Sequence, residues 1–334
     1  MLSVLEKMAK ISVCIPTYNR VNLLPQAIES VLAQTYQDWE LIICDDGSQD
    51  GTVEFMAAYK DKRIKYVRHP ENIGKSNNMR SGFNAATGTY FIKFDDDDRL
   101  TPKFLAKTVA ILESNSELDF VGTDHWIINE EGIRDDKATQ LNSQQWGRTN
   151  LKEGMVEDLL SVVFVKQSFQ VGATLFRREV LVEVDFMRPD WQSCEDNDLL
   201  VRLALAGKKA YYLPELLMEY RFHSEQGGID RAIPYLRDKL RYLNSYQFES
   251  ERLEQVREKR LGETQQILGV RLIEQGDSLK GRELIQQSLN TLGNSSKATL
   301  GLILSYFPLG LQQFALLVFR RIRSQDYARK VRQS

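Results

Sequence analysis

The 334-residue chain has little cysteine and little histidine, three of each. Cys14, Cys44 and Cys194 are too few for a disulfide framework, and there is no CxxC pair or His/Cys cluster that would suggest zinc. Cys14 and Cys44 lie within apolar stretches, so we expect core residues in a reducing compartment. The first residues, 1–7, lack the long apolar core of a signal peptide. These absences predict a cytoplasmic protein.

Two common nucleotide-binding motifs are also missing. Gly74-Lys75-Ser76 resembles the end of a P-loop, but His69 occupies the position where the first glycine is required. No GxGxxG follows a predicted strand, which argues against a dinucleotide-binding domain.

The chain also lacks a strong overall charge, and its charge is unevenly distributed. The formal net charge is -2, which implies no general affinity for nucleic acid. Residues 235–334 nevertheless carry 17 basic and 10 acidic side chains, so this region is basic and the remainder is acidic. After Tyr235 helical spacing of apolar residues dominates. We therefore predict two domains, 1–234 and a helical region 235–334.

Residues 90–100 contain the most informative stretch. Tyr90–Phe94 is predicted to be a buried strand, and four carboxylates, Asp95–Asp98, follow it directly. Thr101 and Pro102 suit the start of a helix. Ligands of open α/β sheets bind past the carboxyl ends of strands, and four adjacent acids favour a hard cation such as Mg²⁺ or Mn²⁺. The alternative is a solvated acidic turn.

Strands and helices alternate along the first 225 residues, which predicts βαβ units and a mostly parallel sheet. A second polar loop, Asp45–Thr52, follows a buried strand. The stretch 134–154 is polar and without clear periodicity, so we expect a long loop that contributes to acceptor choice. Glu195 and Asp196 precede a helix predicted over 199–206.

These motifs together resemble the inverting glycosyltransferases of family 2, which have the GT-A fold. The resemblance covers about residues 10–225 and includes the motifs Ser12–Asn19, Asp45–Ser48 with Asp50–Thr52, the Asp95–Asp98 run with its DXD pattern, and Glu195-Asp196. It implies a nucleotide-diphospho-sugar donor, a divalent metal, a carbohydrate or lipid-linked acceptor, and inversion at the anomeric carbon. It also implies a role in polysaccharide or glycan synthesis.

By position, the resemblance assigns a role to each candidate site residue. Asp196 would be the general base and Glu195 would orient it or contact the acceptor. Asp97 would be the direct metal ligand. The residues lining the donor site would be Pro16, Thr17 and Tyr18 at the nucleoside, Asp46 at the base, and Asp95 and Asp96 along the ribose and diphosphate.

Two further residues carry weaker assignments. Relatives usually have Arg-Asn before a glycine, whereas this chain has Met79-Arg80-Ser81-Gly82, so the register by which Arg80 would approach the diphosphate is open. His223 follows a predicted strand and is either a metal or diphosphate contact or a structural histidine.

Alternatives to these roles remain at this point. Asp46 and the Glu195-Asp196 pair would also suit helix capping, and Tyr18 would suit a core cap. As an acceptor-only group Asp46 suits an N–H of uracil or thymine, which favours a UDP- or dTDP-sugar. Competing functions are a nucleotidyltransferase, a glycoside hydrolase and a non-enzymatic carbohydrate-binding protein. The stretch 16–20 has no glycine, which disfavours the first of these.

Residues 298–334 form an apolar segment followed by a basic one. No charged residue occurs over 298–319, and six basic residues but one acid follow over 320–332. Pro308, Gly310, Gln312 and Gln313 interrupt the apolar part, which favours a helix lying in the interface of an anionic membrane over a transmembrane span. A core helix is the other alternative.

Overall fold

The computed structural model describes residues 10–222, 229–293, 296–308 and 310–311. Contacts divide the chain into two units, Met1–His223 and Ser224–Ser334. The boundary expected at 234/235 falls inside helix α8 (Ile229–Asn244), which continues through Pro234.

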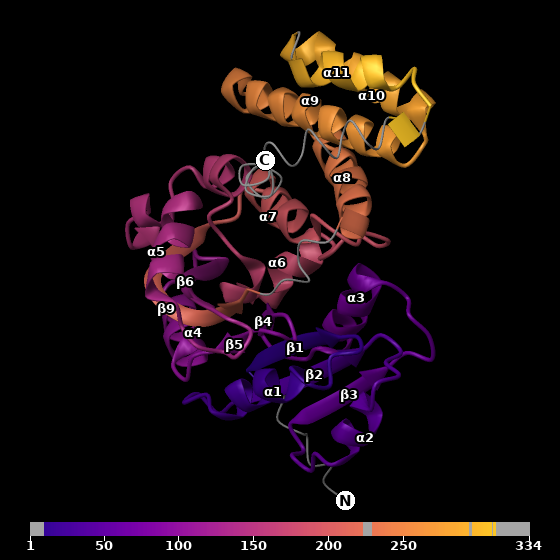
Figure 1. Cartoon of the computed structure of the whole chain (residues 1–334). Coiled ribbons are helices and arrows are strands. Elements are labelled where there is room, and N and C mark those ends of the chain that lie inside the picture. The colour runs from indigo at the N-terminus through magenta and orange to yellow at the C-terminus, as the bar shows by residue number, and fades with distance from the viewer. Residues whose placement is uncertain (1–9, 223–228, 294–295, 309, 312–334) are drawn as a thin grey trace, which may run out of the picture. The chain divides into compact units, whose positions relative to one another are not determined.

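The first unit is built on one nine-stranded sheet (Figure 1). Its strands follow the order β3-β2-β1-β4-β8-β6-β9-β5, and β7 pairs with β9. β1 to β4, β6 and β9 run parallel, whereas β5, β7 and β8 run antiparallel to their neighbours. The strands are β1 Ile11–Thr17, β2 Trp39–Asp45, β3 Ile64–Arg68, β4 Tyr90–Lys93, β5 Arg99–Leu100, β6 Phe120–Ile128, β7 Gly154–Met155, β8 Thr174–Arg177 and β9 Ala210–Arg221. A mostly parallel α/β sheet is confirmed.

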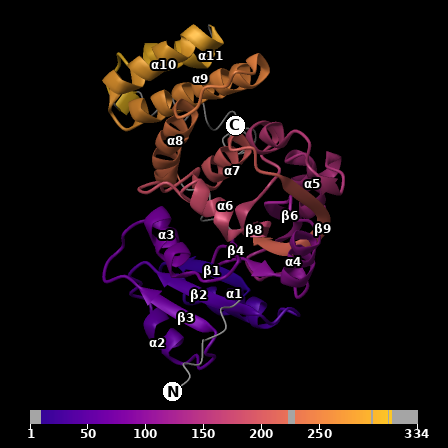
Figure 2. The same ribbon diagram turned by 180° about the vertical axis from the view of Figure 1, so that it is seen from behind.

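Alternating residues of the central strands face opposite layers of helices, as expected for a sheet covered on both sides. Ile11, Val13 and Ile15 of β1 belong to the core that contains the apolar stripes of α1 and α4. On the other face Gly82 of α3 lies so close to the sulfurs of Cys14 and Cys44 that a β-carbon at Gly82 would clash with both. The helices of this unit are α1 Leu24–Leu32, α2 Thr52–Ala57, α3 Lys75–Ala85, α4 Phe104–Ser114, α5 Asp136–Gln145, α6 Arg178–Glu183 and α7 Glu195–Leu205, seen from behind in Figure 2.

The cap expected at Thr101-Pro102 does not form, although a helix follows the acid run. α4 begins at Phe104, because Arg99 and Leu100 pair with β9 and the Thr101 amide donates to the Leu217 carbonyl. β9 continues through Pro214, and its pairing with β6 shifts register at this point, which accommodates the proline.

The stretch 134–154 is not a long loop, because it contains α5. Asp135 caps this helix by accepting from the Ala138 amide at 2.8 Å. The buried side chains of α5 are those of two polar residues, Thr139 and Ser143. The sequence therefore lacks the helical spacing of apolar residues that would predict this helix. α5 packs on β6 through this polar face.

A buried ion pair connects α5 and the following turn to β6. Arg148, 3% exposed, donates from Nε to Asp124 Oδ1 at 2.6 Å, and Ser143 Oγ donates to Asp124 Oδ2 at 2.7 Å. Removing one partner of a buried pair leaves an uncompensated charge, which costs more than the pair itself contributes.

We therefore predict that Arg148→Met lowers the free energy of unfolding by about 3–5 kcal/mol, measured by urea denaturation. Lys152→Met is the control, because Lys152 is exposed on the same stretch, and it should change stability by less than about 0.5 kcal/mol. Equal effects of the two substitutions would contradict the structural role of this pair.

The second unit is helical, as predicted. Besides α8 it contains α9 (Glu251–Glu274), α10 (Ser278–Leu292) and α11 (Ser296–Leu304). Ala298 of α11 is buried with Ile273 and Ile285, so this part of the apolar segment is a core helix. None of the helices in the described ranges combines the length and apolar character needed to cross a membrane.

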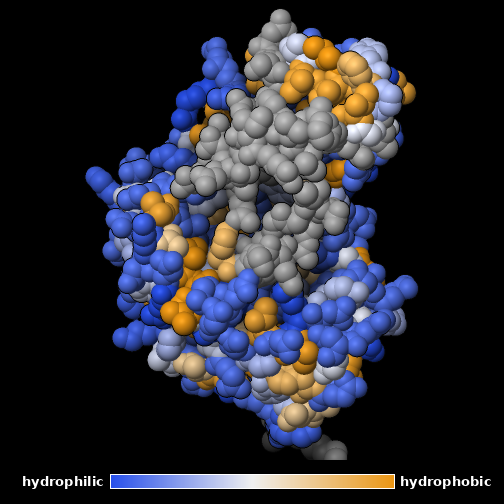
Figure 3. Space-filling view, viewed as in Figure 1, coloured by the Kyte–Doolittle hydropathy of each residue, from blue (hydrophilic) through white to orange (hydrophobic). Residues whose placement is uncertain are grey.

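Large apolar side chains are exposed where the described part of this unit ends. Ile303, Tyr306, Phe307 and Leu311 are each about half exposed or more, and hydrophobic residues gather over this region in Figure 3. The basic stretch 320–332 lies outside the described residues.

Candidate functional site

The carboxyl ends of three neighbouring strands form one edge of the sheet. Thr17, the last residue of β1, is in register with Asp45, the last residue of β2. Lys93, the last residue of β4, pairs with Cys14 three positions before the end of β1. The polar loops predicted to follow these strands therefore leave the sheet at the same edge.

The loops after β1 and β2 are tied to each other by hydrogen bonds. The Asn19 amide donates to Ser48 Oγ at 2.9 Å, and the Val21 amide donates to Asp50 Oδ2 at 2.9 Å. Pro16 and Thr17 are buried in β1, whereas Tyr18 is 45% exposed. This arrangement leaves the Tyr18 ring accessible beside the site, as stacking on a nucleoside would require.

Asp46 holds the loop that leads into α3. Its Oδ1 accepts from the Ile73 amide at 2.7 Å and its Oδ2 from the Gly74 amide at 3.2 Å. Gly74 has a φ of 90°, a conformation that glycine adopts readily. A carboxylate accepts about four hydrogen bonds, so Asp46 retains capacity for a ligand N–H.

The acid run is anchored at its far end by Arg221, which is 1% exposed. Arg221 donates from its amide to Asp98 Oδ1 and from Nε to the Asp97 carbonyl oxygen, both at 2.8 Å. Asp96 is buried, and burial together with the charges of Asp97 and Asp95 raises its pKa to about 7, although Thr17 lowers it. The run is a short turn between two strands rather than between a strand and a helix.

Two lysines that sequence reasoning missed balance the acids. Lys93 Nζ lies 2.9 Å from Asp95 Oδ1 and 3.8 Å from Asp196 Oδ1. Lys75 Nζ, at the start of α3, lies 2.7 Å from Glu195 Oε1. Burial alone would raise the pKa of Asp95, but Lys93 and Lys75 hold it below its ordinary value. Two sequence features could have identified these lysines. Lys93 is the only charged residue in the apolar stretch Tyr90–Phe94, and Lys75 lies in a Gly-Lys-Ser sequence that fits no P-loop.

Glu195 and Asp196 lie in the first turn of α7, not ahead of it as predicted. The helix starts earlier because acidic side chains are favourable at a helix N-terminus. Burial would raise the pKa of Glu195, but Lys75 and Lys93 outweigh it and the pKa is lowered. Burial raises the pKa of Asp196; Lys93 opposes this, and Glu195 reinforces it. Adjacent carboxylates with separated pKa values suit different roles in acid–base chemistry.

The Arg80 side chain contacts the loop that follows α6. Its Nη1 donates to the carbonyl oxygens of Asp185 and Met187 at 3.0 and 2.6 Å, and its Nη2 lies 2.9 Å from Asp185 Oδ1. Arg80 thus ties α3 to the loop after α6. In this register the Arg80 guanidinium group binds the loop after α6, and its approach to a diphosphate stays a prediction.

The chemistry of the acid run fits a divalent cation. Burial and the charges of Asp97 and Asp95 raise the pKa of Asp98 well above its ordinary value, so ionisation of the whole run is unfavourable, and a bound cation would relieve this repulsion. Magnesium is usually bound through one or two carboxylates plus substrate phosphates, and Asp97 can supply such a ligand. Within the described residues there is no group of three His, Cys, Asp or Glu side chains around a common metal position. His223 lies outside the described residues.

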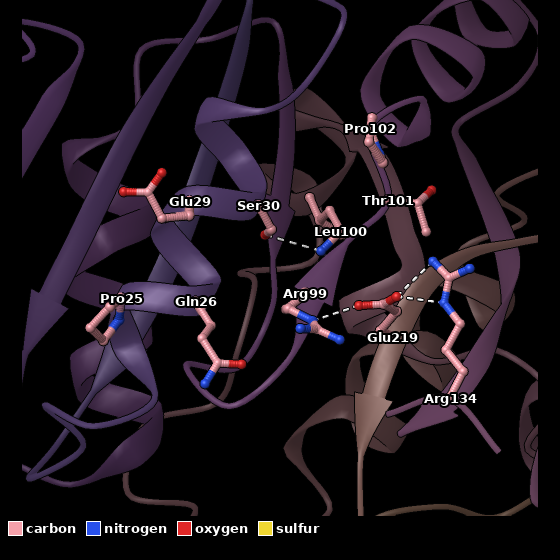
Figure 4. Close-up of a pocket in the computed structure, with 10 residues that line it drawn as sticks. All are labelled: Pro25, Gln26, Glu29, Ser30, Arg99, Leu100, Thr101, Pro102, Arg134 and Glu219. Atoms are coloured by element: carbon pink, nitrogen blue, oxygen red, sulfur yellow. Dashed lines mark hydrogen bonds and ion pairs between the residues drawn. The ribbon is translucent and has the colours of Figure 1, made fainter. Parts of the chain in front are cut away.

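A separate cavity of about 480 Å³ lies between α1, β5 and β9 (Figure 4). Its two arginines share one carboxylate, because Arg99 Nε and Arg134 Nε donate to the two oxygens of Glu219 at 2.5 and 2.7 Å. Neither the candidate base nor the acids Asp95–Asp98 line this cavity.

Relatives of known family share this sequence pattern. Residues 12–184 match the model of the family described as Glycosyl transferase family 2. EpsE of Bacillus subtilis, provisionally named a glycosyltransferase, is 39% identical over 129 residues, 37% of this chain and 46% of EpsE. The uncharacterised glycosyltransferase alr2836 of Nostoc sp. is 32% identical over 231 residues, 67% of this chain and 68% of alr2836. WfgD of Escherichia coli, named as a UDP-Glc:alpha-D-GlcNAc-diphosphoundecaprenol beta-1,3-glucosyltransferase, is 30% identical over 37% of this chain and 48% of WfgD. The chain thus spans about half the length of EpsE and WfgD.

Solved structures share the fold. TarS of Staphylococcus aureus, solved with UDP-GlcNAc, aligns with a TM-score of 0.60 at 15% identity over 91% of this chain and 88% of TarS. The mannosyltransferase PcManGT of Pyrobaculum calidifontis, solved with GDP-Man and Mn²⁺, aligns with a TM-score of 0.56 at 15% identity over 96% of this chain and 89% of PcManGT. The first unit has the expected GT-A fold, the second is a helical extension, and the chain belongs to glycosyl transferase family 2.

Proposed function

We propose that this glycosyltransferase moves a sugar from a UDP- or dTDP-sugar to a hydroxyl group of a carbohydrate or lipid-linked acceptor, with inversion at the anomeric carbon. The observation that carries the proposal is the position of Asp196: it shares Lys93 with Asp95, so the candidate base lies beside the candidate donor residues. The product would belong to cell-surface polysaccharide or glycan synthesis.

The donor side would be formed by the loops after β1, β2 and β4. Tyr18 would stack on the base, Asp46 would accept from its N–H, and Asp95 and Asp96 would lie along the ribose and diphosphate. WfgD is named for a UDP-Glc donor and TarS was solved with UDP-GlcNAc, and these uridine nucleotides support UDP. GDP-Man bound to PcManGT makes a guanosine donor the alternative to test.

The transfer is a single displacement. The acceptor oxygen forms a bond to the anomeric carbon while the bond between this carbon and the diphosphate oxygen breaks. Asp196 takes the proton of the attacking hydroxyl, which is a weak nucleophile until that proton is removed. Glu195, held by Lys75, would orient Asp196 or contact the acceptor. The nucleoside diphosphate leaves with the bonding electrons.

A Mg²⁺ or Mn²⁺ ion would be held by Asp97, with His223 as a second candidate ligand. When bound, such an ion neutralises developing negative charge on the leaving diphosphate. PcManGT was solved with Mn²⁺, which supports this choice. The backbone carbonyl of Asp97 is held by Arg221, so its side chain can be altered without removing this anchor.

The end of the chain would suit a protein that works at the inner face of the plasma membrane. The exposed apolar side chains at the end of α11 continue into an uncharged stretch and then into the basic residues 320–332. Apolar residues next to a cluster of lysines and arginines favour binding to anionic lipid. The protein would then be cytoplasmic and peripheral.

The donor and the metal can be tested in one thermal-shift screen. We expect UDP- or dTDP-sugars to raise the melting temperature in the presence of Mn²⁺ and much less with EDTA, because Asp97 would hold an ion that favours binding of the diphosphate. Asp97→Ala should lose both the metal-dependent shift and transfer while keeping the fold. Full transfer in EDTA, or stabilisation by GDP-mannose alone, would refute the metal or the donor assignment respectively.

Asp196→Asn should lower kcat by about 10²–10⁴-fold, because it keeps the shape of the side chain and removes its basicity. Donor affinity, measured by calorimetry, should change little. Because the pKa of Asp196 is raised, the activity of the unmodified enzyme should fall, as the pH is lowered, through a range above that of an ordinary aspartate. Near-normal turnover of the variant would exclude Asp196 as the base.

Binding of the tail to lipid can be tested by vesicle flotation. We expect the full chain to float with anionic vesicles and less so with neutral ones, and a chain lacking 312–334 to stay in solution. This deletion keeps α11, whose Ala298 contributes to the helical core. Equal flotation of the truncated chain would show that the tail is not the anchor.

A further inference from the structure

Lys93 is an unusual residue for the end of a central strand. Its side chain is 1% exposed, and it follows three apolar residues of β4. A lysine is rarely buried unless it is paired. Its position therefore requires a partner, and the structure supplies two carboxylates from distant parts of the sequence.

The two partners of Lys93 belong to different halves of the site. Asp95, 2.9 Å away, lies on the donor side, whereas Asp196, 3.8 Å away, lies in the first turn of α7. Asp196 Oδ1 is buried and has no hydrogen-bond partner among residues that the structure describes. This oxygen is thus held mainly by the charge of Lys93 at longer range.

We propose that Lys93 is a positioning residue for the general base. Its ammonium group lies between Asp95 and Asp196, holds both carboxylates in place, and keeps Asp196 ionised next to the donor. The proposal rests on the transfer function argued above. Lys93 would not touch the reacting atoms, and it would act through Asp196.

The groups around Asp196 determine the direction of the effect. Lys93 from β4 and Lys75 from α3 favour the ionised form, whereas burial, Glu195 from α7 and Asp95 favour the protonated form. When Lys93 is removed, Lys75 still favours the ionised form of Asp196, against burial, Glu195 and Asp95. The Asp196 carboxyl should then hold its proton to higher pH, and less base should be ionised near neutrality.

Lys93→Met removes the charge and keeps most of the side-chain length. We expect the Asp196 carboxyl, followed by ¹³C NMR of aspartate-labelled protein and assigned by its loss in Asp196→Asn, to titrate about 1 to 3 higher on the pH scale. The acidic limb of the kcat profile should move by the same amount, with activity recovering at high pH. Lys93→Arg, which retains the charge, should move the profile less.

Lys65→Met is the matched control. Lys65 lies on β3 and pairs with Glu40 at 2.5 Å rather than with Asp95 or Asp196, so the Asp196 titration should be unchanged. If Lys93→Met does not fold, Lys93→Arg carries the test of Lys93, and Lys75→Met, at a side chain that is 41% exposed, measures the contribution of the other lysine. It should shift the titration in the same direction but by a smaller amount.

The outcomes separate this proposal from the transfer function. An unchanged Asp196 titration in both lysine variants, or a uniform loss of activity at all pH values, would overturn the role of Lys93. A raised titration in a protein that transfers no sugar would support the charge coupling and reject the proposed function. A raised titration together with a shifted activity profile would support both.

Discussion

Opposite charges buried at the carboxyl edge of the sheet are the constraint on which the site depends. Asp95, Glu195 and Asp196 cannot all be ionised in a partly buried place without compensation, and Lys93 and Lys75 supply it. The lysines come from a strand and a helix that precede α7 by more than a hundred residues. Charge balance therefore requires α3, β4 and α7 to converge, and the local geometry follows from it.

Backbone hydrogen bonds position the rest of the site. Asp46 fixes the entry to α3 through two amides, and this places Lys75 at the start of that helix. The Lys75 amide in turn donates to Gln192 at 3.1 Å, just before α7. Arg221 fixes the far end of the acid run. Each polar loop is thus held by a group from another element, so the proposed donor residues and the proposed base are positioned together.

The sequence allowed the sheet and the candidate residues to be predicted, but not their environment. β1, β2 and β4 are mostly apolar, and their polar ends indicate the edge at which ligands bind. α5 was missed because its buried face is polar, and the cap predicted at Thr101-Pro102 does not form because Arg99 and Leu100 pair with a strand more than a hundred residues away. Interactions of this kind leave no local pattern. The same holds for Lys93, whose role is set by Asp196.

The distinction between Asp97 and Asp196 illustrates why position matters more than residue type. Both are aspartates in acidic surroundings, but a carboxylate bound to a cation is a poor proton acceptor, whereas a buried carboxylate opposed by only part of the local charge retains its basicity. Burial raises the pKa of Asp196 and Lys93 limits that rise. A raised pKa is the property expected of a general base, which is the role proposed for Asp196. The lysine that permits burial of the acids would then also limit how strong a base the site contains.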